Sequence, residues 1–190
     1  MGLGTTIVLG LGGLFVLAVV LYYILSIYNG LVTLKNSIRK NLSNIDVLLK
    51  QRADLIPNLV ETVKSYMKYE KDIIAQITNS RVAMMGATNL GDKAKASDQL
   101  SGALKSLFAL AENYPKLKAS ENFFKLQQQL EGIENQIADR RELYNDSVNI
   151  YNTKIESIPD VVFAKLLGYT KEEYFKATEE EKKEVEVNLQ

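Results

Sequence analysis

The chain has 190 residues with 23 basic and 23 acidic side chains, and it contains no cysteine, histidine or tryptophan. The lack of cysteine excludes disulfides, thiolate nucleophiles and cysteine-based metal sites. The lack of histidine removes the commonest metal ligand and general base. We therefore expect a non-enzymatic protein with no catalytic residue, no metal site and no cofactor.

The N-terminal part of the chain is uncharged and apolar. The first charged side chain is Lys35, and residues 7–28 form an apolar stretch of 22 residues. At about 1.5 Å per residue, a helix of this length crosses a hydrocarbon core of about 30 Å. A cleaved signal peptide would have a basic start, a shorter apolar stretch and a small-residue cleavage site. Residues 1–29 are therefore predicted to be a retained transmembrane anchor.

The residues around the anchor predict its orientation. Tyrosine rings favour the membrane interface, and three tyrosines lie near the C-terminal end of the stretch: Tyr22, Tyr23 and Tyr28. Basic side chains follow the anchor, beginning at Lys35, and none precedes it. The positive-inside rule then predicts a single-pass protein of the cell (inner) membrane, with the N-terminus outside and the C-terminal domain in the cytoplasm.

Glycines in the first half of the anchor offer a contact surface. Gly10, Gly12 and Gly13 are small enough to let two membrane helices approach closely, which predicts a homo-oligomer. Glycine is also common in membrane helices, and no complete G-x-x-x-G is present, so both interpretations stay open. Membrane lipids are the other expected partner.

Apolar residues recur every three or four positions after the anchor, which predicts helices and no strands. Pro57 is expected to break or sharply kink the helix, because proline and the residue before it disfavour a helix interior. The predicted fold is all-α: the transmembrane helix continues into an antiparallel four-helix bundle over residues 30–158. Its helices are expected at about 30–54, 57–88, 93–113 and 120–157.

Residues 159–190 are predicted to form short helices and an acidic tail. One short helix is expected over residues 161–167, stopped by Gly168. Thr170 and Thr178 each precede acidic residues in the pattern of a capping box, which favours further helix starts.

The apolar stripe of the last long helix is interrupted by Arg140 and Arg141, so one of them should point inward. A buried guanidinium needs a carboxylate or several acceptors. Asp54 and Glu61, on either side of the predicted break, are the expected partners. Asn145 and Asn152, further along the helix face, are expected to join them in a buried polar network. We favour a role in fixing the register of the bundle, with ion or small-molecule binding as the alternative.

Two asparagines lie further along the same helix face. The pairs Tyr144-Asn145 and Tyr151-Asn152 are seven residues apart and share that face. Core tyrosines with hydrogen-bonding asparagines explain this pattern better than a ligand site does.

Two long motifs occupy residues 52–64 (RADLIPNLVETVK) and residues 110–119 (LAENYPKLKA). The first resembles the hallmark stretch of the LemA family, and the second resembles its second signature. Leu130, Glu134, Ile137, Arg141, Tyr144 and Asn145 fit its third. Gln51 departs from the pattern, because many relatives have an arginine there. The resemblance implies a single-span membrane protein with a cytoplasmic four-helix domain. It marks the following as structural or interaction positions: Arg52, Asp54, Pro57, Asn58, Glu61, Tyr114, Pro115, Arg141, Asn145 and Asn152.

These features favour a membrane-anchored scaffold that self-assembles through its anchor and first helix and organises membrane or membrane proteins. The alternative is a monomeric adaptor facing the cytoplasm, which would offer residues 52–64 or the acidic tail to a membrane protease or stress-response protein. The basic residues are too few and too scattered to predict nucleic-acid binding.

Overall fold

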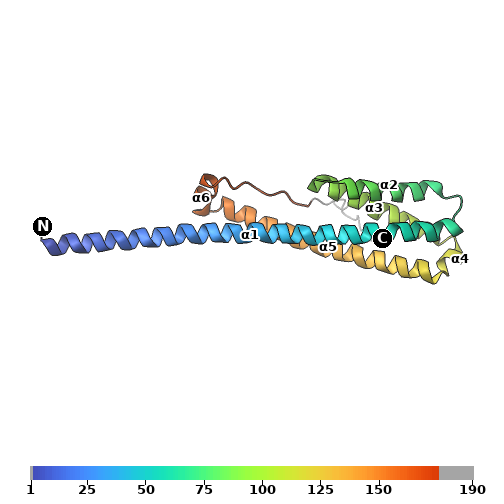
Figure 1. Ribbon diagram of the computed structural model, residues 1–190, viewed down its shortest axis with the longest axis horizontal. Coiled ribbons are helices and arrows are strands. Elements are labelled where there is room, and N and C mark those ends of the chain that lie inside the picture. The colour runs from blue at the N-terminus through green and yellow to red at the C-terminus, as the bar shows by residue number, and fades with distance from the viewer. Residues whose placement is uncertain (1, 176–190) are drawn as a thin grey trace, which may run out of the picture. The chain divides into compact units, whose positions relative to one another are not determined.

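The structure, a computed structural model, describes residues 2–175, and over this range it is helical with no strand (Figure 1). The all-α prediction is therefore confirmed. The helices are α1 (Leu3–Tyr66), α2 (Lys71–Gly86), α3 (Leu90–Ala111), α4 (Pro115–Lys118), α5 (Glu121–Glu156) and α6 (Asp160–Leu166). The described residues group into two compact units, one of 2–40 with 146–173 and one of 41–145 with 174–175.

α1 carries the candidate membrane anchor. Every residue from Leu9 to Tyr23 is exposed, and from Leu9 onward Ile27 is the first buried side chain. Apolar surface of this extent is unfavourable in water. The stretch is long and apolar enough to cross a membrane, as the sequence predicted.

The predicted break at Pro57 is wrong, because Pro57 lies inside α1 and the helix continues to Tyr66. A proline inside a helix leaves the carbonyl four residues earlier without its amide donor, here that of Ala53. Arg81 of α2 donates its Nε–H to this carbonyl, at 2.8 Å. A side chain from another helix thus replaces the missing backbone donor. The first predicted bundle helix therefore ends at Tyr66 instead of residue 54, and the second begins at Lys71 instead of residue 57.

This arrangement predicts energetic coupling between Pro57 and Arg81. Arg81→Met should lower the free energy of unfolding by about 1–2 kcal/mol, since a partly buried carbonyl loses its donor. In a Pro57→Ala background, the alanine amide supplies that donor, and Arg81→Met should then cost less than about 0.5 kcal/mol. Urea titrations of the four proteins, followed by circular dichroism, measure the coupling. Equal losses in both backgrounds would contradict this account of the helix.

The unit of residues 41–145 has its core between the long helices. Its largest buried side chains include Ile45, Ile56 and Leu59 of α1, Ile77 of α2, Leu100 and Leu107 of α3, and Leu130 and Ile137 of α5. α2 packs against α3 (Figure 1). The Asn89 side chain accepts a bond from the Asp92 amide at 2.8 Å, so α3 starts at Leu90 instead of residue 93. The short α4, with Pro115 in its first turn, was not predicted.

In the unit of residues 2–40 and 146–173, α1 lies against the end of α5 and against the segment that follows α6. Its buried side chains include Ile27, Leu31 and Ile38 of α1, Val148, Tyr151 and Ile155 of α5, and Ala164 of α6. Gly168 has φ +73°, a left-handed conformation that favours glycine, and it follows the end of α6 as predicted.

The helix start predicted at Thr170 is wrong, because residues 170–175 are not helical. The backbone groups of Glu172 and Phe175 bond to asparagine side chains of α5, which takes them away from any helical pattern. Thr178 lies outside the described residues.

Candidate functional site

A buried cluster of charged and hydroxyl side chains surrounds Arg52 of α1. The Arg52 side chain is fully buried. Its Nη1 donates to Ser101 Oγ at 2.9 Å and forms an ion pair with Glu134 of α5. Its Nη2 donates to the backbone oxygen of Ser97, at 3.1 Å, and to Ser97 Oγ, at 2.6 Å. One guanidinium therefore connects α1 to α3 and α5.

Arg141 of α5 forms the second half of the cluster. Its Nη1 pairs with Asp98 at 2.8 Å, and its Nη2 donates to Ser97 Oγ at 2.8 Å. Its guanidinium also lies 4.6 Å from the centre of the Phe175 ring. Arg140 is exposed, so the prediction that one of the two arginines points inward is confirmed, and the inward one is Arg141.

The carboxylates predicted to pair with the buried arginine are the wrong ones. Asp54 and Glu61 are exposed, and Asp54 bonds to the neighbouring Lys50 at 3.3 Å. Because α1 continues through Pro57, successive residues turn by about 100°, which puts both carboxylates on the side opposite Arg52. Glu134 and Asp98, from other helices, supply the negative charges instead.

The cluster balances its charges internally. Burial lowers the pKa of the Arg52 guanidinium from its ordinary value, and the nearby Glu134 carboxylate opposes this effect. Two guanidinium groups meet two carboxylates, so each buried charge has a counter-ion. The Nε atoms of Arg52 and Arg141 have no hydrogen-bond partner among the described residues. Across residues 2–175, no group of three or more acidic side chains could hold a metal ion. The arrangement can hold three helices in one register.

Two asparagines of α5 each hold one residue of the segment after α6. In the unit of residues 41–145, Asn145 Nδ2 donates to the Phe175 oxygen at 3.0 Å, and its Oδ1 accepts from the Phe175 amide at 2.8 Å. In the other unit, Asn152 makes the same pair of bonds with Glu172, both at 3.0 Å. The prediction of hydrogen-bonding asparagines is confirmed. They bind backbone, however, and do not join the arginine cluster.

The tyrosines beside these asparagines are buried, as predicted. Tyr144 packs edge-to-face against Phe175, with ring centres 6.4 Å apart. Tyr151 donates its hydroxyl to the Thr170 oxygen at 2.9 Å, and burial raises the pKa of the Tyr151 phenol. Both rings therefore help to hold the segment that follows α6.

The other predicted positions lie apart from the cluster. Tyr114 donates its hydroxyl to Glu70 at 2.8 Å, a bond that raises the pKa of the Tyr114 phenol. Pro57, Asn58 and Pro115 are exposed. The membrane positions Gly10, Gly12, Gly13, Tyr22, Tyr23 and Tyr28 are also exposed, and a Cβ added at any of the three glycines would meet open space.

Sequence reasoning missed the α3 side of the cluster. Ser97 lies three residues before Leu100 on the buried side of α3, so a polar residue in that apolar stripe was the available signal. Asp98 and Ser101 give no comparable signal, because short polar residues are common on exposed helix faces.

A model of the LemA family matches residues 41–189. The chain belongs to the LemA family. It is 27% identical over 174 residues to Magnetosome protein MamQ 2 of Paramagnetospirillum magneticum, covering 78% of this chain and 64% of that protein. It is 25% identical over 174 residues to Magnetosome protein MamQ of Magnetospirillum gryphiswaldense, with the same coverage. Protein LemA of Metamycoplasma hominis is 24% identical over 180 residues, with 92% of this chain and 81% of that protein covered. The chain thus spans just under two thirds of the MamQ proteins.

Proposed function

We propose that this LemA-family chain is a non-enzymatic, membrane-anchored scaffold that self-assembles through its anchor and first helix. The observation that supports this most is the apolar surface of α1, where every residue from Leu9 to Tyr23 is exposed. Lipid and the anchors of identical chains are the surroundings that such a surface suits. The scaffold would organise membrane or membrane proteins from the cell (inner) membrane, with its C-terminal part in the cytoplasm.

The residues after the anchor would form the antiparallel four-helix bundle, held in register by the Arg52 cluster. This cluster supports a structural role, because its charges are paired inside the protein and none is left to act on a ligand. The relatives named as magnetosome proteins support it as well, since their names refer to a cellular structure and not to a reaction.

Part of the hallmark stretch supplies a second surface for contacts. Asp54, Pro57, Asn58 and Glu61 all lie exposed on α1, at spacings of three or four residues that put them on one side of the helix. Motif residues on the surface suit binding better than packing. In the scaffold these four residues would contact another copy of the chain. In the alternative function, a monomeric adaptor, the same four residues would contact a membrane protease or stress-response protein.

The scaffold predicts that filling the space at Gly13 weakens assembly. Gly13→Leu keeps the anchor apolar, and the added side chain prevents the close approach of two helices. Gly13→Arg adds a charge and should disrupt assembly further. Gly86→Leu is the matched control, because Gly86 also has open space around it but lies at the end of α2.

The measurement is the mass of the native complex after gentle extraction, together with its lipid content. A large complex for the unchanged chain and for Gly86→Leu, with smaller particles for both Gly13 variants, is the expected result. A monomer in every case would favour the adaptor. Unchanged large complexes for both Gly13 variants would show that the anchor glycines are not the basis of assembly.

A further inference from the structure

The short helix α6 and its flanks expose an apolar stripe. Ile158, Val162 and Leu166 follow one another at intervals of four residues, with exposed fractions of 89%, 56% and 77%. Leu167 extends the stripe and is 50% exposed. On the other side of the helix, Ala164 is buried against the rest of its unit. An amphipathic helix normally turns its apolar side inward, whereas α6 leaves Val162 and Leu166 exposed and Phe163 only half-buried.

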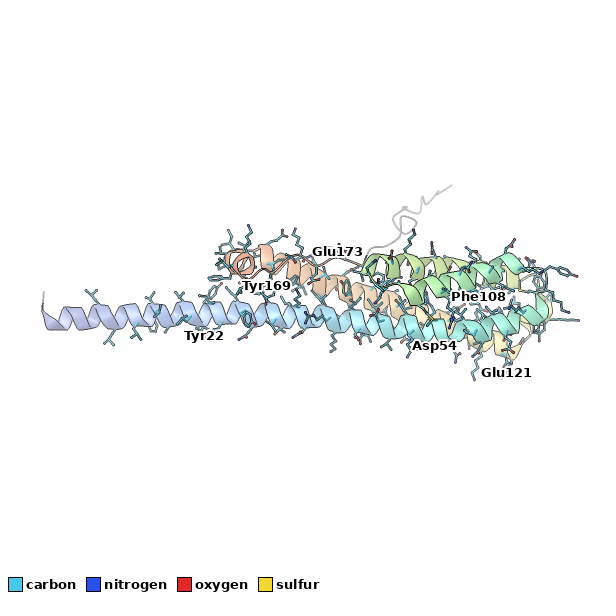
Figure 2. The ribbon with its side chains drawn as sticks, turned by 45° about the horizontal axis from the view of Figure 1, so that its top comes forward. Tyr22, Asp54, Phe108, Glu121, Tyr169 and Glu173 are labelled. Atoms are coloured by element: carbon cyan, nitrogen blue, oxygen red, sulfur yellow. The ribbon has the colours of Figure 1, made fainter. Side chains whose placement is uncertain are left out.

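The residues at both ends of α6 connect it to the end of the anchor. A Cβ at Gly30 of α1 would be 3.3 Å from Lys154 Cε, and Lys154 Nζ lies 3.4 Å from Asp160, the first residue of α6. Just after α6, the ring of Tyr169 lies 5.8 Å from Lys35 Nζ of α1. Figure 1 shows α6 at the end of α5, and Figure 2 shows Tyr169 between α6 and α1, beyond the exposed section that carries Tyr22.

The level of α6 along α1 determines what can cover the stripe. Gly30 is two residues beyond Tyr28, the last residue of the apolar stretch. With a rise of about 1.5 Å per residue, α6 stands within several ångströms of the membrane boundary. An amphipathic helix at this level lies in the plane of the membrane, with its apolar side buried about 5–10 Å into the boundary between headgroups and acyl chains. The exposed Lys165 in the last turn of α6 suits contact with headgroup phosphates.

We propose that α6 docks on the lipid bilayer, with Ile158, Val162 and Leu166 inserted into the boundary between headgroups and acyl chains. The partner is the lipid surface itself. This contact rests on the anchoring part of the proposed function and is independent of self-assembly. A span and a surface helix within one compact unit fix the tilt and rotation of α1 in the membrane, which a single span alone leaves free.

The test uses single tryptophans, because the chain contains none. Leu166→Trp reports on α6, and Leu21→Trp reports on the anchor. Ile150→Trp is the matched control: Ile150 is 56% exposed, like Val162, and lies one turn of α5 before Lys154, away from α6. The full chain is reconstituted in three kinds of phosphatidylcholine vesicle. Their acyl chains carry bromine at a shallow position near the headgroups, at a deep position near the bilayer centre, or not at all. Brominated lipid should reduce the Leu166→Trp emission by about half and leave Ile150→Trp nearly unchanged.

Each outcome separates this inference from the proposed function. If Leu21→Trp is not quenched by lipid brominated at either shallow or deep positions, the anchoring premise fails with the inference. If Leu21→Trp is quenched while Leu166→Trp behaves like Ile150→Trp, only the docking of α6 is overturned. A blue-shifted but unquenched Leu166→Trp emission would show that protein covers α6, which also overturns the proposal. Leu167→Trp replaces Leu166→Trp if that variant loses helical content.

Discussion

Replacing Glu134 with leucine is expected to lower the free energy of unfolding by about 3 kcal/mol, because Arg52 then stays charged and buried without its counter-ion. Arg52 keeps its bonds to Ser97 and Ser101, but neither group carries a charge. The Glu134 side chain is 41% exposed, so the loss should lie at the lower end of the range for buried pairs. Urea titration of the full chain in detergent measures this loss.

The double variant Arg52→Met with Glu134→Leu separates pairing from packing. Since it removes both charges and keeps similar volume, it should recover most of the lost stability. The matched control is Glu112→Leu, which removes an exposed partner of Lys118 and should cost less than about 0.5 kcal/mol. If the double variant is as unstable as the sum of its two single variants, the cluster does not act as a pair.

Asn145→Ala is expected to release the segment around Phe175. The substitution removes both bonds to the Phe175 backbone, at a cost of about 2 kcal/mol for two partly buried groups. Local opening should become about 30-fold more frequent, so the Phe175 amide should exchange its hydrogen about 30-fold faster. Hydrogen exchange followed by mass spectrometry of the C-terminal peptides measures this rate.

Asn58→Ala provides the comparison for Asn145, because the Asn58 side chain is exposed on α1. That variant should leave exchange at Phe175 unchanged. Asn145→Asp adds a sharper test: it keeps the acceptor for the Phe175 amide but replaces the donor to the Phe175 oxygen with a charged oxygen. Exchange at least as fast as in the alanine variant is expected. Unchanged exchange in both Asn145 variants would show that the edge-to-face contact with Tyr144 holds the segment without the asparagine.

The sequence by itself determined the features that depend on local composition and on the spacing of apolar residues. The uncharged stretch up to Lys35 predicts the apolar part of α1, because length and hydropathy alone decide whether a helix can cross a membrane. Apolar residues that recur every three to four positions predict α5 nearly to its ends. Gly168 marks the end of α6 through its own backbone freedom. The interruption of the α5 stripe predicts that an arginine turns inward, since a helix face follows from spacing alone.

The tertiary structure decided every feature that depends on a residue from another helix. Pro57 stays inside α1 because Arg81 of α2 bonds to the Ala53 carbonyl, a contact that no local rule contains. For the same reason, the predicted partners Asp54 and Glu61 face away from Arg52, and Glu134 takes their place. The segment after α6 is not helical because α5 asparagines hold its backbone. Local propensity predicts a residue's own backbone state, whereas partners far apart in the sequence are chosen by packing.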